Sequence, residues 1–322
     1  MKGWQFTNTN VPLKLVEKPD PVVQPGFVVI DVMAAGLCHS DVAALEDPGW
    51  IGIITAHPMY MGHENAGIIT EIGEGVEEFK VGDRVGIAPL SAKLCAETGR
   101  SWAVGYQCDG GYADKCMVPV DCLVPLPDNV SFLEGAAATD AGMTSYHALY
   151  KAGGAKAGMK VGIIGIGGLG QFAAGMALID NIDLYVCDIN PEARKLAEEM
   201  GIKHVYENAL ELAPANCELI VDFAGFGQTT ADALEAVAPG GTVVVVGMGR
   251  LESKINTRLL ILKQAKLVGS CGGTAQDIKD VYGYFATGKL KPQLHEISFD
   301  EIPEGLERLH RGEVKGRLVA VR

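Results

Sequence analysis

The first 120 residues alternate short apolar runs with turn-forming residues. The runs cover residues 27–36, 66–73, 83–89 and 110–119, and Gly, Pro and Asp separate them at short intervals. Short runs bounded by turn formers are typical of β-strands. This half of the chain is therefore predicted to form an irregular, barrel-like β-domain.

Near residue 140 the pattern changes to apolar strands that alternate with helices, as a buried parallel sheet requires. The expected strands are residues 161–165, 184–188, 218–225, 241–249 and 265–273, with helices beginning near Leu169, Pro191 and Thr229. The tail predicts helix, strand, helix and strand at 276–286, 295–299, 303–311 and 316–321. The class is α/β, with a doubly wound domain (142–271) between two parts of a β-rich domain (1–141 and 272–322).

Composition narrows the choice of partners. The 322 residues include 40 acidic and 27 basic side chains, a net charge of -13. Such a surface repels phosphate backbones and anionic lipids, so neither nucleic acid nor membrane is expected as a partner. The first ten residues, MKGWQFTNTN, contain no apolar core of signal-peptide length. No run of 18 apolar residues occurs in the chain, and its eight cysteines are scattered. A cytoplasmic protein is the expectation.

A glycine-rich loop between an expected strand and an expected helix predicts a dinucleotide site. Residues 165–170 follow the pattern G-x-G-x-x-G, and the candidates are Gly165, Gly167, Gly168, Leu169 and Gly170. The glycines allow a sharp turn and a close backbone approach to a pyrophosphate, which the helix N-terminus stabilises. A tight turn without a ligand, or a methyltransferase that binds S-adenosylmethionine, would use the same pattern.

Asp188 ends the next expected strand, where an acid can bind the adenosine ribose hydroxyls. Its charge would repel the 2′-phosphate of NADP, so NAD is the expected cofactor, although Arg194 is a nearby cation that opposes this preference. Gly247 and Met248, at the end of the 241–249 run, complete the cofactor candidates.

Cys38 and His63 are candidate metal ligands. Each lies on an expected turn beside a strand, Cys38 after Gly36 and His63 before the 66–73 run. Either residue alone is more often a core cysteine or a hydrogen-bonded histidine than a ligand. Together, a thiolate and an imidazole form half of a zinc site.

These residues belong to an ordered set of motifs that spans nearly the whole chain. The motifs are C-x-S-D at Cys38–Asp41, GHE-x-x-G at Gly62–Gly67, GDRV at Gly82–Val85, GGYA at Gly110–Ala113 and the glycine-rich loop. The chain resembles the zinc-containing alcohol dehydrogenases of the medium-chain dehydrogenase/reductase superfamily. The resemblance implies a GroES-like catalytic domain, a Rossmann domain, zinc and NAD as cofactors, and a homodimer or homotetramer.

The resemblance also assigns roles to individual residues. Cys38 and His63 become zinc ligands, and Asp140 takes the third position, where many relatives have cysteine and some bacterial members have aspartate. A carboxylate brings the same charge as a thiolate; alternatively, Asp140 only caps the helix that runs to Tyr150. Glu64 can approach the zinc, and Asp41 accepts the free N–H of His63.

Three further expectations concern proton transfer, the cofactor and the metal count. Ser40 corresponds to a hydroxyl that passes on the alcohol proton, or else caps a turn, and His39 contacts a cofactor phosphate or lies at the surface. Many relatives continue the relay with a histidine where this chain has Ala43. The loop 89–109, where many relatives bind a structural zinc through four cysteines, holds only Cys95 and Cys108, so one zinc per chain is expected.

The favoured function is zinc-dependent hydride transfer between an alcohol, or its aldehyde or ketone, and NAD. The partner would be a small alcohol or carbonyl compound. Two alternatives remain at this stage: a zinc-free quinone or enone reductase of the same superfamily, and a dinucleotide-binding protein without turnover. The ligand set Cys38, His63 and Asp140 argues against the reductase.

Overall fold

The computed structural model describes residues 1–52 and 54–322, which form two compact units. The first unit comprises Met1–Asp140, Thr274–Ala286 and Leu294–Arg322, and the second comprises Ala141–Gly273 and Thr287–Gln293. The segment Thr287–Gln293 joins the second unit through Gln293, whose N–H donates to Gln171 Oε1 over 2.6 Å.

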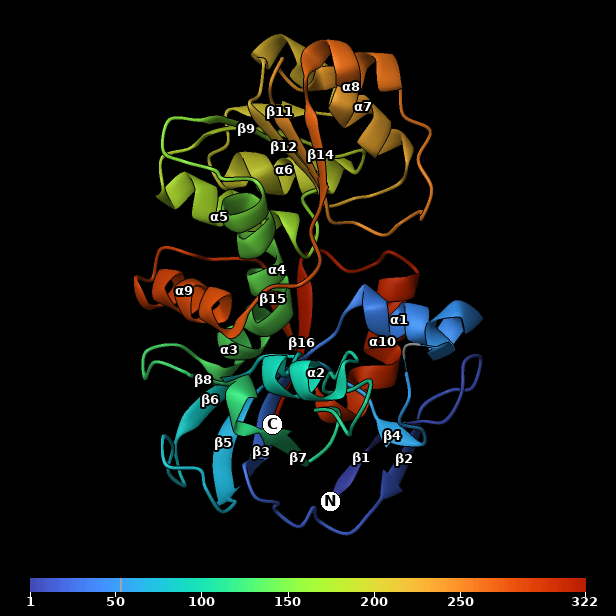
Figure 1. The fold of residues 1–322 in the computed structure, drawn as a ribbon, viewed down its shortest axis with the longest axis vertical. Helices are drawn as coiled ribbons and strands as arrows, with labels where there is room; N and C mark the ends of the chain where they lie inside the picture. Colours follow the sequence, from blue (N-terminus) through green and yellow to red (C-terminus); the bar gives the residue numbers. More distant parts are fainter. Residues whose placement is uncertain (53) are drawn as a thin grey trace. The chain divides into compact units, whose positions relative to one another are not determined.

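The first unit is built around a sheet whose strands follow the order β15-β16-β3-β5-β6-β8, with β7 paired to β3 (Figure 1). Its strands are β3 (Phe27–Gly36), β5 (Glu64–Ile72), β6 (Arg84–Ile87), β7 (Lys115–Pro119), β8 (Leu123–Pro125), β15 (Leu294–Ser298) and β16 (Arg317–Val321). The expected apolar runs thus form strands, and the run 27–36 does so at both expected limits. The barrel-like prediction for this half agrees with this sheet.

A smaller sheet and several helices complete the first unit. The strands are β1 (Lys2–Phe6), β2 (Lys14–Glu17) and β4 (Met59–Tyr60), and the helices are α1 (His39–Glu46), α2 (Ala92–Thr98), α3 (Phe132–Ala137), α9 (Ala275–Ala286) and α10 (Ile302–His310). The β-strands and α10 bury one apolar core, with Ile30, Leu37 and Leu318 fully enclosed. This core fixes the end of β3, from which the candidate metal centre begins.

Residues Phe132–Ala152 form one helical run, part α-helix and part π-helix. Its segments are α3, a π segment at Ala138–Gly142, α4 (Met143–Tyr146) and a second π segment at His147–Ala152. Ser131 caps the start: its hydroxyl accepts the N–H of Glu134, and the Glu134 side chain accepts the N–H of Ser131. Asp140 therefore lies inside the run, and the interpretation of Asp140 as the helix cap is wrong.

The second unit is a doubly wound Rossmann domain. Its six parallel strands follow the order β11-β10-β9-β12-β13-β14 (Figure 1). The strands are β9 (Lys160–Ile164), β10 (Asp183–Cys187), β11 (His204–Tyr206), β12 (Leu219–Asp222), β13 (Thr242–Val245) and β14 (Lys266–Gly269), with helices α5 (Gly170–Ile179), α6 (Pro191–Glu199), α7 (Gln228–Ala236) and α8 (Thr257–Lys263). The strand order reverses between β9 and β12, which is where such sheets bind dinucleotides.

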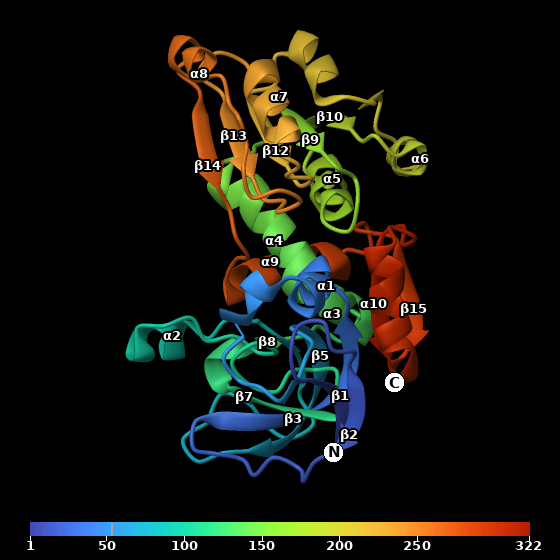
Figure 2. The ribbon, with the colours of Figure 1, turned by 90° about the vertical axis from the view of Figure 1, so that its right-hand side faces the viewer.

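Apolar side chains remain exposed at one edge of this Rossmann sheet. The edge strand is β14 (Figure 2), where Leu267 is 38% exposed. On α8, the helix that precedes it, Ile261 and Leu262 are 70% and 68% exposed. An open strand edge beside apolar side chains is a surface that another chain can cover. Among the residues that the structure describes, no helix is both long enough and apolar enough to cross a bilayer.

Candidate functional site

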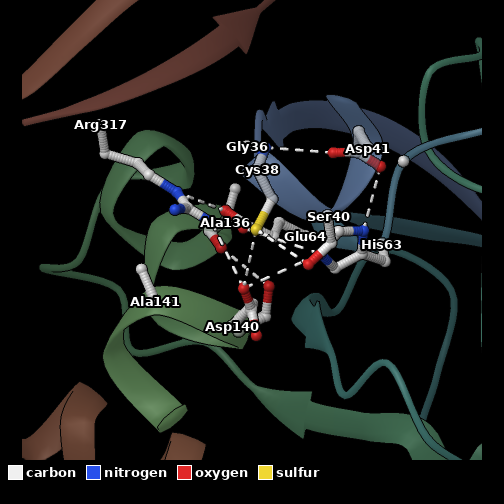
Figure 3. Close-up of polar contacts among 12 residues, drawn as sticks. Gly36, Cys38, Ser40, Asp41, His63, Glu64, Ala136, Asp140, Ala141 and Arg317 are labelled. Atoms are coloured by element: carbon white, nitrogen blue, oxygen red, sulfur yellow. Dashed lines mark hydrogen bonds and ion pairs between the residues drawn. The ribbon is translucent and has the colours of Figure 1, made fainter. Parts of the chain in front are cut away.

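Four side chains of the first unit bring possible metal ligands together. Cys38 Sγ, a ring nitrogen of His63, and carboxylate oxygens of Glu64 and Asp140 all lie within 4.8 Å of one another (Figure 3). Within the described part of the chain, this is the single group of three or more such residues. Cys38, His63 and Glu64 are buried, and Asp140 is partly exposed.

The strand register explains why distant residues meet here. β3 and β5 are antiparallel, and Gly36 at the end of β3 pairs with Glu64 at the start of β5. Cys38 follows β3 by two residues and His63 precedes β5 by one, so both lie at the same end of the strand pair. Asp140 comes from a separate element, the π segment at Ala138–Gly142.

The distances between donor atoms suit a tetrahedral metal. Asp140 Oδ2 lies 3.5 Å from Cys38 Sγ and 3.8 Å from His63 Nε2, and Glu64 Oε1 lies 3.9 Å from His63 Nε2. Ligand bonds of 2.0–2.3 Å around tetrahedral zinc place neighbouring donors about 3.5 Å apart. Sulfur, imidazole and carboxylate are also the ligand types that zinc prefers, so the residues present fit this ion.

Polar contacts orient the His63 ring. Its Nδ1 lies 3.2 Å from Asp41 Oδ1, which is the contact expected from the sequence, and 3.2 Å from the Tyr106 hydroxyl. Asp41 is itself held by the Tyr112 hydroxyl, which donates over 2.7 Å, and by the N–H of Cys38. These contacts turn the other ring nitrogen, Nε2, toward the ligand cluster.

The pKa of His63 reflects these neighbours. Burial disfavours the charged ring, but Tyr106, Asp41 and Asp140 outweigh it and raise the pKa well above its ordinary value. A metal ligand must be the neutral ring, so a bound metal competes with this proton and holds less tightly as the pH falls.

Arg317 is a component of the cluster that the sequence analysis missed. This side chain of β16 is 2% exposed, and its guanidinium forms ion pairs with Glu64 and, over 3.3 Å, with Asp140 (Figure 3). Tyr106, which contacts His63, and Tyr112, which contacts Asp41, were also missed. Only Tyr112 carried a sequence signal, because it belongs to the GGYA motif.

Ser40 lies beside the ligand cluster, whereas His39 lies at the surface. Ser40 Oγ lies 3.6 Å from Cys38 Sγ and is partly exposed, so its hydroxyl lies beside the ligands (Figure 3). His39, the first residue of α1, is exposed. Neither residue belongs to the group of possible metal ligands.

The glycine-rich loop of the second unit has the geometry of a phosphate site. Gly165 adopts φ +89°, which disfavours any side chain, and a Cβ on Gly170 would collide with the carbonyl oxygen of Gly165. No atom lies within 4 Å of a Cβ built on Gly167, so that side of the loop is open. Gly168 and Leu169 complete the turn before α5, and the dipole of this helix N-terminus favours a bound anion.

Asp188 lies directly beside this loop. Its Oδ2 accepts the N–H of Ile166 and its Oδ1 accepts the N–H of Asn190, each over 2.8 Å. Arg194 donates to the Asp188 carbonyl oxygen and pairs with Glu207 over 3.5 Å, so its charge already has an acidic partner.

The remaining cofactor candidates lie after β13. The Gly247 N–H donates to the Asp222 carbonyl over 3.1 Å, and a Cβ on Gly247 would overlap the backbone of Ala224. Met248 is 62% exposed. Both residues follow the carboxyl end of β13, which lies next to the edge strand β14, and sheets of this kind bind ligands at the carboxyl ends of their strands.

Hydrogen bonds organise the loop around Cys95 and Cys108. Cys95 Sγ accepts the N–H of Trp102 over 3.2 Å, and the Ser91 hydroxyl donates to Asp121 over 2.9 Å. Burial raises the pKa of the Cys108 thiol to about 12.

Comparison with known proteins adds independent information. Residues 24–128 match the family described as alcohol dehydrogenase GroES-like domain, and residues 168–287 match the family described as zinc-binding dehydrogenase. An alcohol dehydrogenase of Geobacillus stearothermophilus is 34% identical over 325 residues, which cover 95% of each chain.

Solved structures agree with these matches. The alcohol dehydrogenase of the hyperthermophilic archaeon Aeropyrum pernix superposes with a TM-score of 0.89 at 28% identity, over 100% of both chains. The acetophenone reductase of Geotrichum candidum, solved in complex with NAD, has a TM-score of 0.88 at 28% identity, over 100% of this chain and 97% of that one.

Proposed function

Because the chain belongs to the zinc-containing alcohol dehydrogenase family of the medium-chain dehydrogenase/reductase superfamily, we propose that it transfers hydride between an alcohol or carbonyl compound and NAD at a zinc centre. The observation that carries the zinc part is the cluster of four donor atoms within 4.8 Å. The Rossmann order of the second unit and its open glycine-rich loop support NAD binding.

Cys38, His63 and Asp140 would hold the zinc, with Glu64 as a near ligand. When bound, the ion supplies Lewis acidity that polarises the oxygen of an alcohol or carbonyl group. Ser40, whose hydroxyl lies beside Cys38, would accept the alcohol proton and pass it on. Asp41 would keep His63 in the tautomer that presents Nε2 to the metal.

The cofactor would lie on the second unit. The N-terminus of α5 and the loop Gly165–Gly170 would bind the pyrophosphate, and Asp188 would bind the ribose hydroxyls. Gly247, Met248 and His39 are further proposed contacts of the cofactor. The proposed limits are 142–271 for this domain and 1–141 with 272–322 for the zinc-binding domain.

We further propose a cytoplasmic homodimer or homotetramer that acts on a small molecule. The support for assembly is the open edge of β14 with the exposed Leu267, Ile261 and Leu262. A second copy could extend the sheet across this edge and cover these side chains.

The direct test is to offer the protein a panel of alcohols with NAD or NADP and to measure the rate at which the absorbance of NADH or NADPH appears. The assay is run before and after a chelator has removed the zinc. Turnover with NAD that is lost on chelation and restored by zinc is expected. Chelator-insensitive reduction of quinones or enones would instead favour a zinc-free reductase. Cofactor binding without turnover on any alcohol or carbonyl compound would contradict the proposed activity.

The metal content should be one zinc per chain. The loop that holds Cys95 and Cys108 offers two thiols, and two ligands cannot close a tetrahedral site. Elemental analysis of protein purified with zinc and freed of loose metal measures the ratio. Two tightly bound zinc ions per chain would contradict the expectation.

Asp41→Asn should weaken zinc binding by about 10- to 100-fold, the range typical of losing a partner that orients a metal-bound histidine. The amide keeps the shape of the side chain but loses the charge that faces His63 Nδ1. Zinc affinity is measured by competition with a coloured chelator. Tyr106→Phe, which removes the other contact to the same nitrogen, is the matched comparison, and an equal loss there would assign the orienting role to both.

A further inference from the structure

Arg317 is a buried, positively charged side chain beside the proposed metal ligands, and it has no role in the proposed hydride transfer. Its Nε donates to Glu64 Oε2 over 3.1 Å, and its Nη2 contacts both Glu64 Oε1 and, over 3.3 Å, Asp140 Oδ2. A guanidinium stays charged in proteins, and a buried charge is stable only when it is paired. Arg317 therefore places a permanent positive charge against two of the four donors.

The charges of the cluster show what this cation balances. Cys38, Glu64 and Asp140 can each bring one negative charge, whereas His63 binds a metal as the neutral ring. Two negative charges neutralise a divalent ion, so a third would leave the buried cluster with a surplus. With Arg317 included, the five groups and one zinc ion sum to zero.

The contacts indicate which carboxylate Arg317 balances. Glu64 is fully buried, and both of its oxygens contact the guanidinium in a two-pronged arrangement, whereas Asp140 is touched through one oxygen (Figure 3). Glu64 also lies against Gly36, where a Cβ would collide with its carboxylate, which confines the side chain. Asp140 Oδ2 remains close to Cys38 and His63.

We propose that Arg317 is a positioning residue that holds Glu64 out of the metal's ligand set and so keeps one coordination position open. The inference rests on the proposed zinc site. Without the guanidinium, Glu64 would be an unpaired buried carboxylate within 4.8 Å of the other donors. It would then bind the metal as a fourth protein ligand, and four protein ligands make the closed type of zinc site.

The test uses full-length protein loaded with cobalt(II) in place of zinc, because the visible absorption of cobalt reports its ligands. Imidazole is added as an external ligand for the open position, and its apparent Kd is read from the spectrum. We expect Arg317→Gln to raise this Kd by about 10-fold or more, because Glu64 now competes for the position. The double variant Arg317→Gln/Glu64→Gln, which has also lost the contact to Asp140 but lacks the competing carboxylate, should return to the wild-type value.

Each outcome is decisive. A wild-type-like Kd in Arg317→Gln, as when Glu64 takes up a proton instead, overturns the inference, and so does a double variant that stays as weak as the single one. If Arg317→Gln does not fold, Arg317→Lys carries the test: it keeps the charge but only one contact, so an intermediate Kd supports the inference and an unchanged Kd overturns it. A wild-type protein that binds no cobalt would instead refute the proposed metal site.

Discussion

Cys38→Ala should lose tightly bound zinc and about a thousandfold or more of kcat/KM for alcohol oxidation, since a Lewis acid supplies several kcal/mol of the catalysis. The thiolate is one of the three proposed ligands, and its removal leaves His63 and Asp140 with too few donors to hold the ion. The binding of NADH, followed by its fluorescence, should stay within about twofold because the glycine-rich loop belongs to the other unit. Zinc content, turnover and NADH affinity are measured on the same preparation.

The third ligand offers a matched pair of variants. Asp140→Cys replaces one negative donor by another and should keep zinc, whereas Asp140→Asn keeps the shape but loses the charge and should behave like Cys38→Ala. Cys271→Ala, which removes an exposed thiol outside the cluster, is the control and should change nothing. Full zinc content with full activity in both Cys38→Ala and Asp140→Asn would refute the metal centre.

Asp188→Ala should lower the ratio of kcat/KM for NAD over NADP by about 100- to 1000-fold. The Asp188 carboxylate and the 2′-phosphate of NADP would repel each other by about 4 kcal/mol if they lay about 4 Å apart at an effective dielectric constant near 20. Each tenfold change in the ratio corresponds to about 1.36 kcal/mol, which gives this range. The carboxylate also accepts the N–H groups of Ile166 and Asn190, so its loss loosens the loop and weakens NAD itself. Initial rates with both cofactors give the ratio.

The control for this variant is an acid on β10, the strand that Asp188 directly follows. Asp183→Asn removes an acid from the opposite end of β10, where its contact is to the Tyr185 hydroxyl, and should leave the cofactor ratio unchanged. An equal fall of the ratio in both variants would show that general acidity, and not the Asp188 carboxylate at the loop, sets the preference.

The buried strands were predictable because their apolar runs are continuous or alternate strictly. The runs that became β3, β9, β12 and β16 needed no knowledge of their neighbours. Short or exposed strands gave no such pattern: the residues of β2 (Lys14–Glu17) are largely exposed, and β11 (His204–Tyr206) has three half-buried residues. These strands exist because a neighbour offers them a free edge, which is tertiary information.

The start of the ligand-bearing helix could have been predicted but was not. Ser131 and Glu134 form the S-x-x-E capping box, which marks a helix N-terminus in the sequence itself. Taking Asp140 as a possible cap overlooked this earlier start. The π segment around Asp140 carries no comparable signal, because it depends on how the helix packs.

The candidate metal centre was likewise predictable only in part from the sequence. Cys38 and His63 follow from motifs next to strands, and their meeting follows from antiparallel pairing of β3 and β5. Arg317 is 253 residues away from Glu64 along the chain, and no periodicity relates the two. From the sequence alone, an arginine in an apolar C-terminal strand would be interpreted as a residue at the edge of a sheet. Its burial becomes evident only once the strand is known to pair with β3.

The π segment at Ala138–Gly142 makes the cluster sensitive to chain length as well as to side-chain chemistry. A π-bulge behaves as one additional residue accommodated in an α-helix, and each residue of a helix turns the chain by about 100°. The capping box at Ser131 fixes the start of this helical run. Deleting a single alanine between Ser131 and Asp140 would therefore turn the carboxylate by about 100° relative to that start, away from the sulfur and the imidazole. Such a deletion would keep Cys38, His63 and Asp140 in the sequence but would separate Asp140 from the other two ligands.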